Sequence, residues 1–346
     1  MTLSPDGKRL ACSGGSGVVQ ITDLPSGKAS AVLRGHKEAP WIGFVGSGNR
    51  IASASDGVLV FWNAESGKEI RREKDVDGTP VVIAGQTLLA PFFTPPSAGS
   101  LRLFDREGIL LRTFNLSLKK KGKGLYCVPA ADPAGKRAFA YMDFLTGDLE
   151  EDIFSKDQEV LVSWDLSTGK EPWRSQGAEY LCAFTPDGRA FVSFIMENEE
   201  DPAGTIRFRE SETGALIREW RSHEQNASAM RFLDEGKCLA VAGSGRITLW
   251  SFPEGKSLAD REVLPGGMEF LSPWKNGRYL IAGSRTGERI AIVELPGLET
   301  AAVLKVHEET LRGLEKDPNK GFVVSVDRKG AAALLKTSEE TGKEIQ

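Results

Sequence analysis

The residues from Gly35 to Lys68, GHKEAPWIGFVGSGNRIASASDGVLVFWNAESGK, indicate how the whole chain folds. A Gly-His pair is followed by an apolar segment and a glycine-containing turn. The alternating segment Arg50-Ile51-Ala52-Ser53-Ala54, an Asp-Gly turn and the β-rich segment Val58 to Trp62 come next. A Ser-Gly turn then leads into one more strand. The stretch therefore predicts a meander of four short antiparallel strands.

Two turn markers of this stretch repeat along the chain. The first precedes the second strand of each unit and occurs at residues 5–8, 47–49, 85–86, 134–136, 186–188, 235–237, 276–278 and 319–321. The second precedes the fourth strand and contains Gly27, Gly67, Gly108, Gly169, Gly214, Gly255, Gly297 and Gly342. Successive glycines of the second marker are 40 to 45 residues apart, except for one interval of 61. The long interval indicates an insertion of about 20 residues within an otherwise regular repeat.

Short segments rich in β-branched and aromatic residues lie between the markers, and no segment has a long helical period. The predicted third strands are Val18 to Ile21, Val58 to Trp62, Leu101 to Phe104, Val160 to Trp164, Thr205 to Phe208, Arg246 to Trp250, Arg289 to Val293 and Ala331 to Leu335. A four-stranded sheet at this spacing is typical of a β-propeller blade. We predict an all-β propeller of four-stranded antiparallel blades over residues 1–346, with eight blades favoured over seven. The repeat units span approximately 1–34, 35–75, 76–118, 119–176, 177–221, 222–264, 265–305 and 306–346.

Composition narrows the class of partner. The net charge is -4 and the sequence pI is near 5.7, which disfavours binding to nucleic acid or acidic membranes. No apolar run reaches the length of a membrane-spanning helix, and the first residues lack the features of a signal peptide, so we expect a cytoplasmic protein. The four cysteines stand singly, which predicts small, reduced, hydrophobic side chains and no zinc site or disulfide: Cys12, Cys127, Cys182 and Cys238.

The best unit resembles a known repeat family. Gly35-His36, Ser53, Asp56 and Phe61-Trp62-Asn63 resemble the WD40 repeat, and Leu3 to Ala11 and Thr185 to Arg189 are similar to its inner turn. This resemblance implies a hydrogen-bonded relay of His36, Ser53, Asp56 and Trp62 that ties the strands of one blade together.

The other units depart from the WD40 pattern. Unit six has His223 and Trp250 but Ser244 in place of the aspartate, and unit eight has His307, Ser325 and Asp327 but Leu335 in place of the tryptophan. Units one, three, five and seven have Thr22, Phe104, Arg209 and Val293 at the tryptophan position. We expect apolar burial and the backbone ladder to hold those four blades, because they lack the relay.

The sequence has no recognisable catalytic motif. All three histidines fall at the same repeat position, where His36 is expected in the relay and His223 and His307 are expected half-exposed at blade junctions. No histidine is left for a catalytic triad, and neither a GxxxxGKS/T loop nor an HExxH motif occurs. We therefore predict a protein that is not an enzyme and that has no catalytic residues, cofactor or metal site.

Insertions in units three to five point to a binding surface. They fall in loops that share one face of a propeller, and loops on a rigid scaffold often carry recognition residues. The candidate partner-binding residues are Phe92, Phe93, Lys119, Lys120, Lys121, Lys123, Asp148, Glu150, Glu151, Asp152, Glu199 and Glu200. Adjacent phenylalanines in a proline-rich loop are expected to be exposed. The alternative is that these segments are solvated insertions, and the acidic segment lacks the Asp-x-Asp-x-Asp-Gly spacing of a calcium loop.

The predicted function is a monomeric scaffold that binds other proteins or peptides through the top-face loops of units three to five. One alternative is a sensor or regulatory WD40 domain from a larger protein, such as a kinase-linked one. Another is a hydrolase with paired carboxylates at the mouth of the propeller channel.

Overall fold

The computed structural model describes residues 1–24, 26–94, 98–116, 124–145, 159–177, 179–195, 203–224, 227–275, 277–284, 287, 289–316, 323–327, 329 and 331–335. Within these ranges the chain forms eight antiparallel sheets, called blades one to eight in chain order. Seven sheets have four strands, and the described part of blade eight has three. None of the described residues belongs to a helix that is long and apolar enough to cross a membrane.

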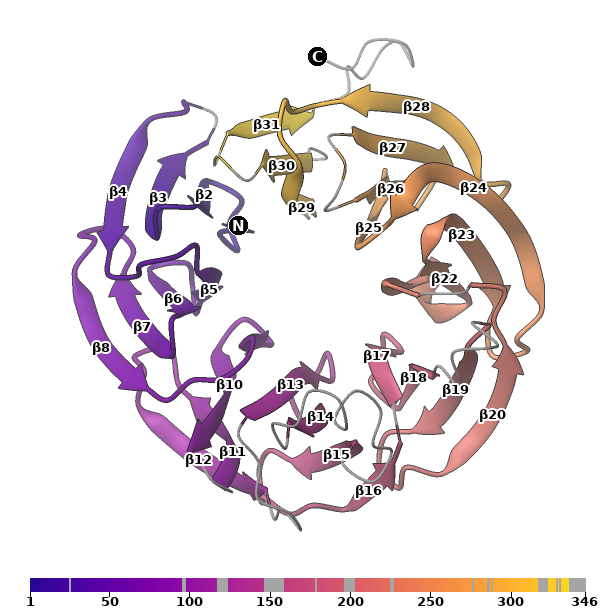
Figure 1. The fold of residues 1–346 in the computed structure, drawn as a ribbon, viewed down its shortest axis with the longest axis horizontal. Helices are drawn as coiled ribbons and strands as arrows, with labels where there is room; N and C mark the ends of the chain where they lie inside the picture. The colour runs from indigo at the N-terminus through magenta and orange to yellow at the C-terminus, as the bar shows by residue number, and fades with distance from the viewer. Residues whose placement is uncertain are drawn as a thin grey trace.

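In each blade the strands follow the chain from the innermost, next to the axis of the ring, to the outermost (Figure 1). Blades one to four contain β1 (Thr2–Leu3), β2 (Arg9–Ser13), β3 (Val18–Asp23), β4 (Ala29–Arg34); β5 (Trp41–Val45), β6 (Arg50–Ser55), β7 (Val58–Asn63), β8 (Glu69–Lys74); β9 (Val81–Ile83), β10 (Thr87–Thr94), β11 (Ala98–Phe104), β12 (Leu110–Leu116); β13 (Gly124–Ala131), β14 (Arg137–Leu145), β15 (Val160–Asp165) and β16 (Trp173–Gln176). Blades five to eight contain β17 (Glu179–Phe184), β18 (Ala190–Ile195), β19 (Thr205–Glu210), β20 (Leu216–Arg221); β21 (Ala229–Leu233), β22 (Cys238–Ala242), β23 (Ser244–Ser251), β24 (Ser257–Gly267); β25 (Phe270–Trp274), β26 (Tyr279–Gly283), β27 (Arg289–Glu294), β28 (Glu299–Lys305); β29 (Leu311–Lys316), β30 (Val323–Asp327) and β31 (Ala332–Leu335), with one 3-10 turn, η2 (Asp234–Gly236).

The eight blades form a closed ring around a central axis, with blade eight beside blade one (Figure 1); we call the region at this axis, bordered by the innermost strands, the channel. This confirms the predicted all-β propeller and decides for eight blades over seven. Each predicted third strand overlaps an observed one. Glycines in left-handed conformations, such as Gly67 (φ 68°) and Gly188 (φ 70°), close the predicted turns without the steric cost that a Cβ atom would add.

The core lies between neighbouring blades. In blade two the middle strands β6 and β7 are almost wholly buried, whereas the outermost strand β8 is largely exposed. Ile21 and Leu33 of blade one, for example, pack in one cluster with Ile42 and Trp62 of blade two. Blades one and eight are joined in the same way, because Leu10 of β2 lies in a cluster with Val324 of β30. All four cysteines are free, as predicted.

Phe92 and Phe93 are buried, so the prediction that they are exposed in a loop is wrong. Phe92 is 1% exposed and packs toward blade two, with its ring centroid 5.9 Å from that of Phe104. Phe93 is 5% exposed and lies in the cluster shared with blade four. The reason is that β10 stays paired with β11 as far as Thr94, while residues 75–77 run alongside it; the Phe93 N–H donates to Asp75 O (3.1 Å). Pro91 lies within this strand and does not end it.

Candidate functional site

In blade two, the residues of the expected relay lie together. Trp62 Nε1 donates a hydrogen bond to Ser53 Oγ (2.8 Å), and Ser53 Oγ lies 2.8 Å from His36 Nε2. Asp56 joins this chain through the backbone, because its Oδ2 accepts hydrogen bonds from the N–H groups of Lys37 (2.9 Å) and residue 38 (3.3 Å). The pKa of Asp56 is lowered mainly by these hydrogen bonds from the backbone, and the pKa of His36 is lowered by burial. The network fixes the loop that enters blade two.

Blade eight has a similar network, and it corrects the expectation for one histidine. His307 is 7% exposed rather than half-exposed. Its Nε2 lies 2.9 Å from Ser325 Oγ, and its Nδ1 lies 3.6 Å from Asp327 Oδ2. Burial lowers the pKa of His307, so the imidazole is a neutral structural group at pH 7.

In blade six a glutamate, and not the histidine of the repeat, lies in the interior, and His223, which was expected to be half-exposed, is exposed. His223 is exposed and stacks on Trp250, with ring centroids 5.3 Å apart, whereas the next residue, Glu224, is 1% exposed. Glu224 Oε1 accepts a hydrogen bond from Thr248 Oγ1 (3.0 Å). Burial raises the pKa of Glu224 to about 7. Trp250 Nε1 has no hydrogen-bond partner, because Val241 stands at the position that a serine occupies in blade two.

Blade five has a charged network where only apolar packing was expected. Glu179 is buried and accepts hydrogen bonds from Ser193 Oγ (2.9 Å), Arg207 Nη1 (3.0 Å) and Arg209 Nη2 (2.7 Å). Arg209 occupies the tryptophan position, and Ser193 the serine position, of the blade-two relay. The arginines and Ser193 lower the pKa of Glu179 against the opposing effect of burial. A carboxylate with these partners is ionised at pH 7 and ties β17, β18 and β19 together.

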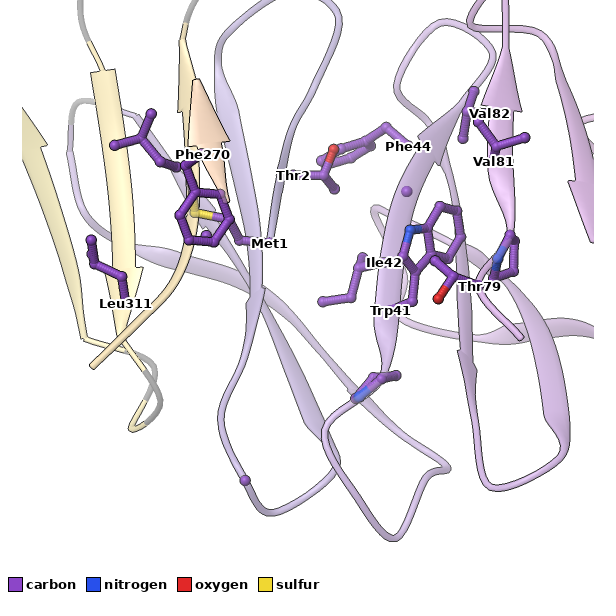
Figure 2. Close-up of a pocket in the computed structure, with 16 residues that line it drawn as sticks. Met1, Thr2, Trp41, Ile42, Phe44, Thr79, Val81, Val82, Phe270 and Leu311 are labelled. Atoms are coloured by element: carbon purple, nitrogen blue, oxygen red, sulfur yellow. The ribbon is translucent and has the colours of Figure 1, made fainter. Parts of the chain in front are cut away.

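One cavity opens at the channel, where the innermost strands begin. It has a volume of about 790 Å³ and is lined by strands of blades seven, eight, one, two and three. Most of its lining side chains are apolar, although polar groups supply slightly more than half of the exposed lining surface. The lining includes Met1, Trp41, Phe44, Val81, Phe270 and Leu311, and Figure 2 shows these side chains around the cavity. None of the described side chains that line it is ionisable. We call this cavity the channel pocket; it provides shape and apolar surface, and its side chains include no acid–base pair.

Gly43 positions the largest side chain of the channel pocket. A Cβ atom at this glycine would lie 2.6 Å from Trp41 Cη2 and 2.9 Å from Val82 Cγ2. The absence of a side chain therefore lets the Trp41 indole lie flat along its own strand. Trp41 is only partly buried, so part of its ring faces the cavity. An aromatic surface held in this way is typical of recognition sites.

Arg231 lies on the innermost strand of blade six, on the opposite side of the ring from blade two (Figure 1). Arg231 of β21 is exposed, makes no hydrogen bond or ion pair in the described part of the chain, and pairs through the backbone with Ala240. In blade two the strand partner of Gly43 is Ala52, and both Ala240 and Ala52 are the third residue of the second strand of their blade. Arg231 and Gly43 therefore lie at the same level along the axis of the ring. Blade six stands across the ring from blade two (Figure 1). Arg231 belongs to the innermost strand of its blade, and burial lowers its pKa although solvent reaches the side chain.

The predicted top-face site differs from this pocket. Ten of the twelve candidate binding residues lie outside the described residues: Lys119, Lys120, Lys121, Lys123, Asp148, Glu150, Glu151, Asp152, Glu199 and Glu200. The other two, Phe92 and Phe93, are buried and do not contribute to a surface. The sequence reasoning missed Trp41, Phe270 and Leu311, because each belongs to a different blade and only ring closure brings them together.

Comparisons with known proteins show the fold alone. No family model matches the chain, and no curated protein matches it in sequence. Its structure is similar to the crystal structure of the computationally designed Ika8 protein, with a TM-score of 0.68 and 17% sequence identity over 94% of this chain and 92% of that one. Altogether 1663 chains of solved structures match. A fold shared so widely does not identify a function, so the function is argued from the site.

Proposed function

We propose that this protein is a non-enzymatic interaction scaffold that binds a peptide segment of a partner protein in the channel pocket. The observation that carries the proposal is the group of large apolar side chains that border the pocket, with the Trp41 indole partly exposed on its strand. Aromatic side chains of this kind supply most of the binding energy in many interfaces. A cavity of about 790 Å³ has room for two or three peptide side chains.

The partner segment carries an apolar side chain and an acidic one. The apolar side chain fits against Trp41 and Phe44, and a carboxylate is the complement of Arg231 across the channel. An unpaired guanidinium in a partly desolvated site gains from a carboxylate, because both form strong charge-assisted hydrogen bonds. This feature favours an acidic peptide over a neutral lipid or a nucleic acid.

We also infer that the propeller is of the WD40 type. The support is the hydrogen-bonded chain of Trp62, Ser53 and His36 in blade two, together with the His307 and Ser325 pair in blade eight. These residues stand at the positions at which the sequence resembles the WD40 repeat. The scaffold role agrees with the common use of this architecture, in which rigid blades present a fixed binding surface.

Selection from a random peptide library on the immobilised protein tests the proposal. We expect enriched peptides to contain an apolar residue close to Asp or Glu, and their affinity to fall about tenfold for Trp41→Ser. Arg231→Ala is expected to weaken acidic peptides but not their Asn or Gln analogues. Enriched peptides that bind Trp41→Ser as tightly as the parent protein would rule out the channel pocket as the binding site.

A further inference from the structure

A second recognition surface lies on the face opposite the channel pocket. Two adjoining cavities of about 660 and 480 Å³ share Pro186, Glu235 and Gly236 and together form what we call the lower groove. It is lined by the turns that follow the first strands of blades five and six and by the outer strands β20 and β24. Since the first strands begin at the channel pocket, the turns at their far ends lie on the other face.

The floor of the lower groove is rigid and apolar. Phe252 packs edge-on against two other rings, with centroids 4.5 Å from Phe208 and 4.8 Å from Phe232. Beside this floor, Ile217 and Leu258 are 53% and 56% exposed. Outer strands of other blades also expose large apolar side chains, for example Leu111 of β12; Ile217 and Leu258 differ in that they border a cavity with an apolar floor.

The polar side of the lower groove is acidic. Its lining contains the carboxylates of Asp187, Glu210, Asp234 and Glu235 and the cations of Arg189 and Lys237. Arg189 lies 3.8 Å from Asp187, whereas Asp234 and Glu235 form no ion pair with any described residue. The lining therefore has two more carboxylates than cations, and this excess is shared equally between blades five and six, next to the apolar floor.

The turn that carries these two carboxylates is strained. Asp234 and Glu235 have φ values of 48° and 53°, a left-handed conformation that glycine adopts in the corresponding turns of blades one and five, at Gly7 and Gly188. Gly236 fixes the turn against blade five, because a Cβ atom there would lie 2.9 Å from Pro186 Cδ. Non-glycine residues adopt the same conformation in the corresponding turns of blades three and seven, at Ala84 (φ 46°) and Lys275 (φ 48°), so it recurs in the repeat and does not by itself mark a functional position.

We propose that the lower groove binds a segment of a partner protein that presents apolar side chains on one side and lysine or arginine side chains on the other. The apolar side chains cover Leu258, Ile217 and the phenylalanine floor, and the basic ones pair with Asp234 and Glu235. This site is separate from the channel pocket and has the opposite charge preference, so the protein holds two different partner segments on its two faces.

Two fluorescent 14-residue amphipathic peptides with the same leucine face test this proposal. One peptide has a lysine face and the other a glutamate face, and anisotropy measures the binding of each. We expect only the lysine peptide to bind, with about a tenfold loss of affinity for the double variant Ile217→Ser with Leu258→Ser. Neutralisation by Asp234→Asn with Glu235→Gln is expected to weaken binding about fivefold and to reduce its salt dependence.

Matched controls come from other blades. The double variant Leu110→Ser with Leu111→Ser removes equally exposed apolar side chains of β12, and Glu38→Gln with Glu65→Gln removes two exposed carboxylates of blade two. Both are expected to bind the lysine peptide like the parent protein. The proposal is overturned if the controls lose as much affinity as the groove variants, or if the glutamate peptide binds equally well. It is also overturned if sedimentation shows a dimer that only the groove variants dissociate, because a second copy then occupies the groove.

Discussion

Replacing Glu224 by glutamine is predicted to stabilise the protein at neutral pH and above. The Glu224 carboxyl is 1% exposed and receives one hydrogen bond, from Thr248, and it forms no ion pair with a described cation. Burial is the main cause that raises its pKa from 4.5 to about 7; the hydrogen bond from Thr248 opposes the rise, the Asp260 carboxylate adds to it and Arg246 opposes it. The folded protein therefore resists ionisation of this group.

The size of the effect follows from the two pKa values. Between pH 4.5 and about 7 the unfolded chain has released the proton while the folded protein keeps it, so stability falls as the pH rises through this window. Each pKa unit corresponds to about 1.4 kcal/mol, which gives a loss of about 3 kcal/mol by about pH 8. A glutamine retains a hydrogen bond with Thr248 and does not ionise.

Urea denaturation of the parent protein and Glu224→Gln at two pH values measures this difference. At about pH 8 we expect the variant to be more stable by about 3 kcal/mol, and at about pH 5 the gap is expected to shrink below about 1 kcal/mol. A gap of equal size at both pH values would refute the reasoning, since it would show that the glutamate carries no excess ionisation cost in the folded state.

Four further changes test other parts of the structure. Glu179→Gln is expected to lower the free energy of unfolding by about 3 kcal/mol at pH 7, because it leaves two arginines without their carboxylate. The difference from the parent protein is expected to narrow as the pH falls below 4.5, because the carboxylate of the unfolded parent chain then takes up a proton while the folded one, whose pKa is lowered, stays ionised. Ser53→Ala removes two hydrogen bonds and is expected to cost about 2 kcal/mol in denaturant melts without changing peptide affinity. Phe92→Ala is expected to cost about 3 to 5 kcal/mol, as a core residue does; a cost below about 1 kcal/mol would contradict its burial. Gly43→Ala is expected to displace the Trp41 indole, seen as a shift in tryptophan fluorescence, and to weaken peptide binding.

The architecture was accessible from the sequence because it depends on local signals. The Asp56-Gly57 turn and alternation such as Arg50 to Ala54 act within a few residues of one another, and the observed strands follow them. The regular spacing of the turn glycines then fixes the number of blades. These features need no knowledge of long-range contacts.

The buried polar networks were only partly predictable. The WD40 resemblance identified His36, Ser53 and Trp62 but gave no sign that Glu179 would replace a histidine in blade five. That glutamate comes from the start of β17, and it meets its arginine partners only when three strands pair. A sequence signal did exist, since an arginine at the tryptophan position implies a nearby carboxylate.

The surface sites were the least predictable part. Proline residues around Phe92 suggested a loop, but the strand continues through Pro91 because its neighbours supply the remaining hydrogen bonds. The channel pocket joins Trp41 to Phe270 and Leu311 across five blades, and this arrangement exists only in the closed ring. Arg231 could have been noticed in the sequence, because it is the one charged residue of the otherwise apolar strand β21.

Hydrogen exchange of the protein with and without a library-selected peptide tests the central claim most directly. The account predicts that the peptide slows exchange at the innermost strands β5, β9 and β25, which line the channel pocket, and that Trp41→Ser abolishes this protection. Protection confined to the outer strands, or protection that persists unchanged in Trp41→Ser, would contradict the assignment of the channel pocket as the binding site.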